Sequence, residues 1–168
     1  VAIRPNVHYY YNNVVRIDDV DIVVSTLWSH IDRENAFMTE RCVSDFRRIM
    51  YNDNILDWQG FNQEHDRCLK FIKEAVRHSD ASKKVVVTHH VPSCQLMSPE
   101  FEGSPINGAF TVELSDYIED SDIDYWIYGH SHRNINKMIG QTKCLSNQLG
   151  YVFQGEHKKF KPDCYIEV

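Results

Sequence analysis

The 168-residue chain is 42% hydrophobic and 25% charged, a composition and length typical of one domain with a core of its own. The formal net charge of −6 argues against a nucleic-acid partner, since nucleic-acid surfaces are normally basic. No apolar run reaches the length of a membrane span, so we expect no membrane partner. Five dispersed cysteines without a CxxC pair predict reduced thiols and a cytoplasmic location.

The first part of the chain predicts a β-hairpin followed by an irregular segment. Val14–Ile17 and Val20–Val24 are β-rich runs on either side of an Asp-Asp turn. In residues 29–60, apolar spacing over 42–50 favours a helix that Thr39 would cap. The segment has two interpretations: packing against the edge of the sheet, or a lid over a substrate site.

A helix and a buried strand form the centre of the prediction. Asn62–Ser79 carries an apolar stripe at helical spacing, with Asn62 as the expected N-cap. The Glu64-His65-Asp66 triplet on it is interpreted as surface. The β-branched residues of Lys83–Pro92 predict a buried strand, which indicates an αβ unit feeding a parallel sheet.

The same pattern repeats further along the chain. Phe110–Asp120 predicts a short helix that feeds an apolar strand over Asp124–Tyr128. Residues 136–146 predict a hairpin around Gly140-Gln141, and Cys164–Val168 predicts a final short strand. The overall expectation is therefore an α/β (α+β) fold.

Both predicted buried strands end in histidines, at the sheet edge where open α/β sheets bind ligands. His89 and His90 follow the first strand, and His130 and His132 follow the second. If the backbone stays extended, His130 and His132 point to the same side, whereas His90 points away from His89. Neutral imidazole binds Zn, Mn, Fe and similar ions, so His89, His130 and His132 are the candidate ligands. The remaining histidines are expected to be surface or hydrogen-bonded residues: His8, His30, His65, His78 and His157.

Two segments carry a resemblance to a known family. The strand and histidines of 85–92 (VVVTHHVP) and of 128–132 (YGHSH) resemble the last two motifs of the calcineurin-like metallophosphoesterases. Their order, their spacing and the strand before each make the match specific. Three further stretches look like bacterial members of this family, and the resemblance covers most of 7–151: Val23–Trp28, Ser104–Asn107 and Ser146–Tyr151.

The resemblance implies a four-layer αββα sandwich with mixed β-sheets and a centre of two divalent metal ions. His89 and His130 would bind one ion and His132 the other, and His90 would touch the substrate or support a ligand. A metal-activated water would hydrolyse a small phosphomono- or diester. Asn107 and Arg133 are candidate contacts to the phosphate.

The family's first three motifs are absent, since the sequence contains no Asp-x-His, Gly-Asp or Asn-His-Asp/Glu. We therefore expect residues 1–168 to be a single metallophosphoesterase domain that lacks its N-terminal part, with an apolar sheet face uncovered. The alternative is a truncated or degenerate module that binds a metal or a partner without catalysis.

Overall fold

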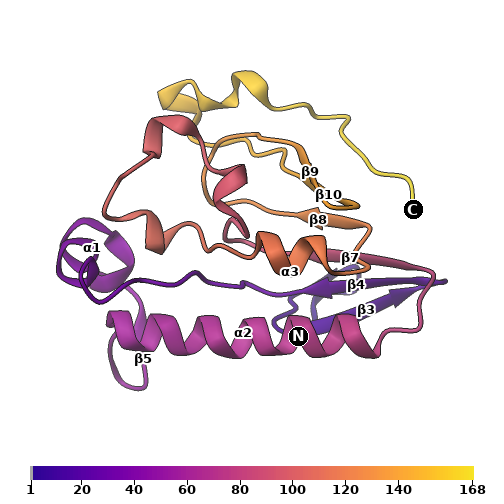
Figure 1. The fold of residues 1–168 in the computed structure, drawn as a ribbon, viewed down its shortest axis with the longest axis horizontal. Coiled ribbons are helices and arrows are strands. Elements are labelled where there is room, and N and C mark those ends of the chain that lie inside the picture. Colours follow the sequence, from indigo (N-terminus) through magenta and orange to yellow (C-terminus); the bar gives the residue numbers. More distant parts are fainter. Residues whose placement is uncertain (1) are drawn as a thin grey trace.

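The computed structural model describes residues 2–168 and shows a mixed α/β fold around one six-stranded sheet (Figure 1). The four inner strands are parallel, and an antiparallel strand closes each edge. In spatial order the strands are β3 (Asn13–Ile17), β4 (Val20–Val24), β7 (Lys83–Val87), β8 (Tyr125–Ile127), β10 (Thr142–Leu145) and β9 (Lys137–Ile139).

The helices and the minor hairpins lie outside this sheet. The helices are α1 (Ala36–Cys42), α2 (Trp58–His78) and α3 (Ser115–Glu119), and short 3₁₀ turns lie in the loops. The hairpins pair β1 (Ala2–Arg4) with β2 (Val7–His8), and β5 (Met50–Tyr51) with β6 (Asn54–Ile55).

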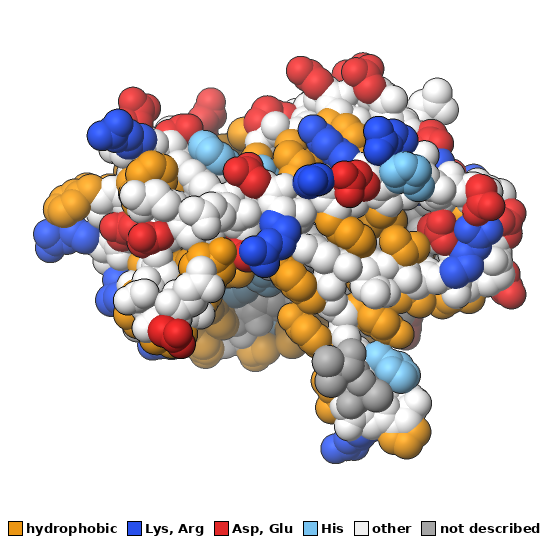
Figure 2. All heavy atoms as spheres, turned by 90° about the horizontal axis from the view of Figure 1, so that it is seen from below, with side chains coloured by type: hydrophobic (Ala, Val, Ile, Leu, Met, Phe, Trp, Pro, Cys, Tyr) orange, Lys and Arg blue, Asp and Glu red, His pale blue; other side chains and the backbone are white. Residues whose placement is uncertain are grey.

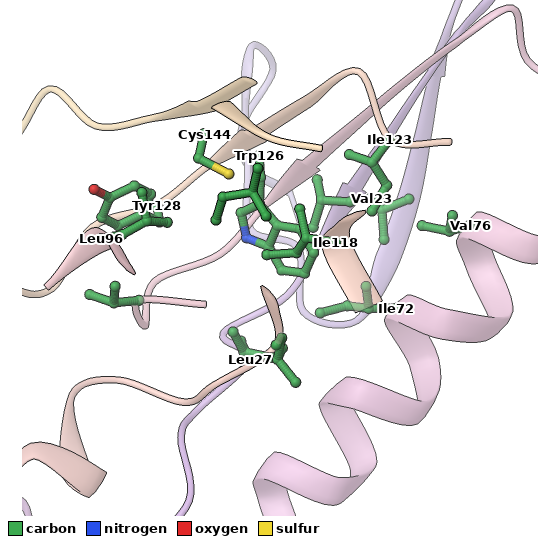
Figure 3. Close-up of a cluster of buried hydrophobic side chains, with 14 residues drawn as sticks. Val23, Leu27, Ile72, Val76, Leu96, Ile118, Ile123, Trp126, Tyr128 and Cys144 are labelled. Carbon is green, nitrogen blue, oxygen red and sulfur yellow. The ribbon is translucent and has the colours of Figure 1, made fainter. Parts of the chain in front are cut away.

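One face of the sheet forms the main core beneath α2 and α3. A row of four residues in register crosses β4, β7, β8 and β10, and all four are fully buried: Val23, Val86, Trp126 and Cys144. Ile72 and Val76 of α2 and Ile118 of α3 pack onto this row (Figure 3). Because strand side chains alternate between faces, the sequence run Val85-Val86-Val87 sends only its middle residue into this core.

The opposite face of the sheet is buried less evenly: Val85 is 3% exposed, whereas the row beside it is only partly buried. The next row in register consists of Val24, Val87, Ile127 and Leu145. The C-terminal segment contacts this region, where the Tyr125 hydroxyl donates to the backbone oxygen of Glu167 at 3.2 Å.

Several predicted elements are confirmed. The first hairpin pairs Ile17 with Val20 around a left-handed Asp18, and β7 lies parallel to its neighbours β4 and β8. The hairpin of β9 and β10 turns at Gly140, whose φ of 56° suits glycine.

The helix starts differ from the prediction. Helix α2 begins at Trp58, where the Asp57 side chain accepts from the Gly60 amide at 2.7 Å. Asn62 instead lies inside the helix, and its side chain binds both backbone groups of Ile31. Thr39 is likewise an interior residue of α1 and no cap, because that helix runs from Ala36.

Two surface assignments on α2 were wrong. Glu64 and His65 are 7% and 4% exposed, because Tyr11 and the β5 hairpin contact Glu64, and the segment after β4 contacts His65. The Tyr11 and Tyr51 hydroxyls donate to Glu64 at 2.5 and 3.1 Å. His65 lies 3.2 Å from the backbone oxygen of Leu27 through Nδ1.

Two later elements are shorter than predicted. Only Ser115–Glu119 of the expected 110–120 helix is helical, since residues 107–111 form a 3₁₀ turn and a bridge to Val91. The predicted strand over Cys164–Val168 is absent from the described residues, which continue there without regular structure.

Residues 29–60 contribute to a second, smaller hydrophobic core and do not form an unpacked loop. Phe46 and Leu56 join Phe61 and Ala109 in this cluster, which favours the packing interpretation. No helix among the described residues is long and apolar enough to cross a membrane. On the face in Figure 2, acidic, basic and hydrophobic side chains are interspersed.

Candidate functional site

The parallel strands β7 and β8 bring two predicted ligands together. His89 follows β7 and His130 follows β8, and Nε2 of His89 lies 3.0 Å from Nδ1 of His130. Both strands run toward the end of the molecule where α1 and the loop after β7 lie (Figure 1). The contact depends on the parallel register, in which Val87 lies beside Ile127.

The backbone at the strand ends is strained. His130 and His132 have φ values of 69° and 52°, and Leu27 and Trp28 after β4 have 66° and 54°. Left-handed conformations at such residues cost about 1–3 kcal/mol each and concentrate at functional sites. The extended geometry assumed for His130 and His132 is therefore wrong, and their placement results from these turns.

Burial keeps the histidine pair neutral. Burial, followed by the charge that the neighbouring His89 would carry, lowers the pKa of His130 to about 4. Burial also lowers the pKa of His89, although part of that side chain reaches solvent. At pH 7 both rings therefore keep a lone pair, which is the form that binds metal.

The His90 ring packs against the His130 ring. Its ring is buried and stacks on that of His130 with centroids 4.3 Å apart. Nδ1 of His90 lies 2.9 Å from the Ser29 hydroxyl, and Phe110 stacks on the other side of His130 at 4.8 Å. His130 is thus held between two rings, and His90 is not directed into open space.

His132 is directed to a different partner. Its Nδ1 lies 2.9 Å from Oε2 of Glu156. The Tyr151 ring packs edge-on against the His132 ring, with the ring centroids 4.5 Å apart. Its backbone amide donates to Gln148 at 2.8 Å. Sequence reasoning missed Glu156, because no motif surrounds it and the C-terminal segment has no periodic pattern.

The two predicted phosphate contacts have protein partners. Arg133 forms ion pairs with Glu100 and, at 3.1 Å, with Glu156, and these carboxylates raise its pKa. The Asn107 side-chain amide donates to the backbone oxygen of Phe101 at 2.6 Å. Either side chain would have to exchange these partners to bind phosphate.

A cavity of about 460 Å³ opens beside His130 and His132. Four segments form its walls: the turn after α1 (42–45), the loop after β7 (97–111), the histidine turn (130–133), and the C-terminal residues Tyr151 and Glu156. Although residues 29–60 are packed, their Cys42–Asp45 turn therefore contributes a wall of this cavity.

The described residues contain no complete metal-binding group. Around the His89–His130 pair, no third His, Cys, Asp or Glu in residues 2–168 completes a metal-binding group. The pair supplies two neutral nitrogens, and His132 stands apart with its carboxylate partner.

The comparison with known proteins finds a viral relative. The chain is 28% identical over 179 residues to an uncharacterized protein of Acanthamoeba polyphaga mimivirus, and the match covers 98% of the chain. The chain spans 61% of the length of that relative. No protein-family model matches the chain, and no solved structure matches it.

Proposed function

We propose that the protein is a metal-dependent phosphoesterase, to which residues 1–168 contribute the histidine half of the metal centre. The observation that supports this most is the pair of neutral nitrogens of His89 and His130, 3.0 Å apart at the ends of adjacent parallel strands. The resemblance of both histidine segments to metallophosphoesterase motifs adds to it. The sheet would then be half of an αββα sandwich, with the second sheet packed on the half-buried row of Val87 and Ile127.

The separation of the pair fits joint ligation. Two nitrogens bound to one zinc-like ion at about 2.0–2.1 Å lie about 2.9–3.4 Å apart for angles between ligands of about 90–110°. The observed 3.0 Å lies in this range. The same residues would suit Mn or Fe, since imidazole serves several divalent ions.

The second ion would take His132. Its Nδ1 is held by Glu156, so its Nε2 remains available as a ligand. Carboxylates of this kind orient ligating histidines and raise their basicity. The bridging carboxylate and the remaining ligands would come from residues outside 1–168.

Bound divalent ions would supply Lewis acidity toward the phosphate and make water more acidic. The chain's own residues would set the geometry. His90 and Phe110 fix the His130 ring between them, and Glu156 fixes His132. Such preorganised ligands need little rearrangement when the ester binds.

Hydrolysis by the protein at its full natural length tests the proposal. After EDTA treatment and reloading with Mn²⁺, we expect hydrolysis of bis(4-nitrophenyl) phosphate, reduced at least 100-fold by His130→Ala. His78→Ala is the matched control, because His78 is exposed and its Nδ1 lies 2.7 Å from the Glu74 backbone oxygen within α2. Full activity of His130→Ala at saturating Mn²⁺ would overturn the assignment. Bound metal without turnover of any ester would favour the non-catalytic alternative.

A further inference from the structure

The cavity beside the histidines has largely aromatic and apolar walls. Phe101 and Phe110 come from the loop after β7, and Tyr151 comes from the C-terminal segment. Met97 and Ile106 extend the apolar surface between them. Such walls stabilise a flat apolar group by stacking and by removing its surface from water.

The charge around the same cavity is unfavourable for a highly charged anion. Asp45 and Glu156 contribute carboxylates to the lining, and Arg133 is the cation among the described lining residues. Arg133 is already paired with Glu156 and with Glu100. A ligand with two or more negative charges outside the metal centre would therefore meet like charge without a free cation.

The size of the cavity limits the ligand as well. About 460 Å³ falls in the usual range of roughly 300–1,000 Å³ for small-molecule sites. It has room for an aromatic ring with its linking atoms beside the phosphate. It also lies against His130 and His132, so an ester group seated there keeps its phosphorus near the proposed metal centre.

We infer that the substrate is a phosphodiester with a single negative charge, one of whose ester groups is aromatic or apolar and lies in this cavity. The inference rests on the proposed function. Hydrolysis adds the oxygen of water to phosphorus, breaks the bond to one ester oxygen and transfers a water proton to that oxygen. An alcohol or phenol and a phosphomonoester are released.

Ligand binding tests the inference without turnover. By calorimetry on the metal-free protein at its full natural length, we expect diphenyl phosphate to bind at least fivefold more tightly than phenyl phosphate at pH 8. Phe101→Ala should weaken diphenyl phosphate binding about five- to tenfold. Phe37→Ala is the control, because Phe37 is 69% exposed and is not part of the cavity lining.

Hydrolysis gives the second arm of the test. Bis(4-nitrophenyl), ethyl 4-nitrophenyl and mono-4-nitrophenyl phosphate share a leaving group but differ in the second ester group and in charge. We expect kcat/KM with Mn²⁺ to fall in that order, and Phe101→Ala to remove the advantage of the first over the second.

The outcomes separate the two proposals. Tight binding of diphenyl phosphate with no hydrolysis of any ester would sink the proposed function but keep the ligand site. Equal or tighter binding of phenyl phosphate, or no effect of Phe101→Ala on either measurement, would overturn the inference even in an active phosphoesterase.

Discussion

Nε2 of His89 and Nδ1 of His130 lie 3.0 Å apart although 41 residues separate them in the chain. The parallel pairing of β7 with β8 produces this contact, and the strained turn at His130 aims its ring. The pair therefore depends on both the sheet register and the turn at His130, and changes that preserve both should leave it in place.

Glu156 should control metal affinity through His132. In the protein at its full natural length, Glu156→Gln keeps the size of the side chain but removes the charge that His132 and Arg133 contact. Loss of such a carboxylate partner typically costs about 10–100-fold in metal affinity. Competition with a chelating dye measures the metal affinity. Glu74→Gln is the control, because Glu74 is exposed. Equal affinities of the two variants would show that Glu156 does not orient a ligand.

The core beneath α2 should dominate stability. Ile72 is fully buried against the sheet, so Ile72→Ala should lower the free energy of unfolding by about 2–5 kcal/mol. Ile55→Ala, at a position 48% exposed, should change it by no more than about 0.5 kcal/mol. Urea unfolding followed by circular dichroism compares the two variants. Equal losses in the free energy of unfolding would contradict the packing of Ile72 against the sheet.

Acidification should destabilise the fold through buried histidines. Burial lowers the pKa of His65, and burial followed by the nearby histidine charges lowers that of His90 further. Below about pH 6.5 the unfolded chain therefore binds protons that the folded chain does not. Stability is present above that pH and is lost as the pH falls toward the folded pKa values.

Urea unfolding of the EDTA-treated protein at pH 7.5 and pH 5.5 measures this loss. We expect a fall of about 1 kcal/mol for each such histidine. His65→Gln retains a donor for the Leu27 oxygen that His65 contacts and should show a smaller fall. A pH-independent free energy of unfolding would rule out neutral buried histidines.

The half-buried sheet face should make residues 1–168 associate when expressed alone. The row Val24, Val87, Ile127 and Leu145 crosses four strands in register, and apolar patches of this kind favour association. We expect concentration-dependent oligomers in size-exclusion chromatography with light scattering, and fewer of them for Val87→Lys. A monomer with one cooperative melting transition would speak against a missing layer.

Much of the sheet was predictable from local sequence. The β-branched run at Val85–Val87 and the turn residues at Asp18 and Gly140 specify strands and hairpins through short-range preferences, and the structure follows them. The predicted N-cap of helix α2, Asn62, lies five residues after the actual one, because Asn62 resembles a cap while the capping side chain is that of Asp57.

The surroundings of the histidines were less predictable. Glu156 lies 24 residues beyond His132, and its contact depends on irregular backbone that carries no periodic signal. The burial of Glu64 depends on Tyr11, 53 residues earlier in the chain. Patterns in a single sequence indicate local conformation and the periodic alternation of buried and exposed residues. The contacts of Glu156 and Glu64 instead form only when distant segments of the chain pack together.

The metal content of the protein at its full natural length tests the central claim most directly. By mass spectrometry of the purified, Mn²⁺-loaded protein, we expect two ions per chain, which is the content the resemblance implies. His89→Ala and His130→Ala should each lose the ion that this pair would share, and His132→Ala should lose the other. Unchanged metal content in all three variants, with folding confirmed by circular dichroism, would contradict the account.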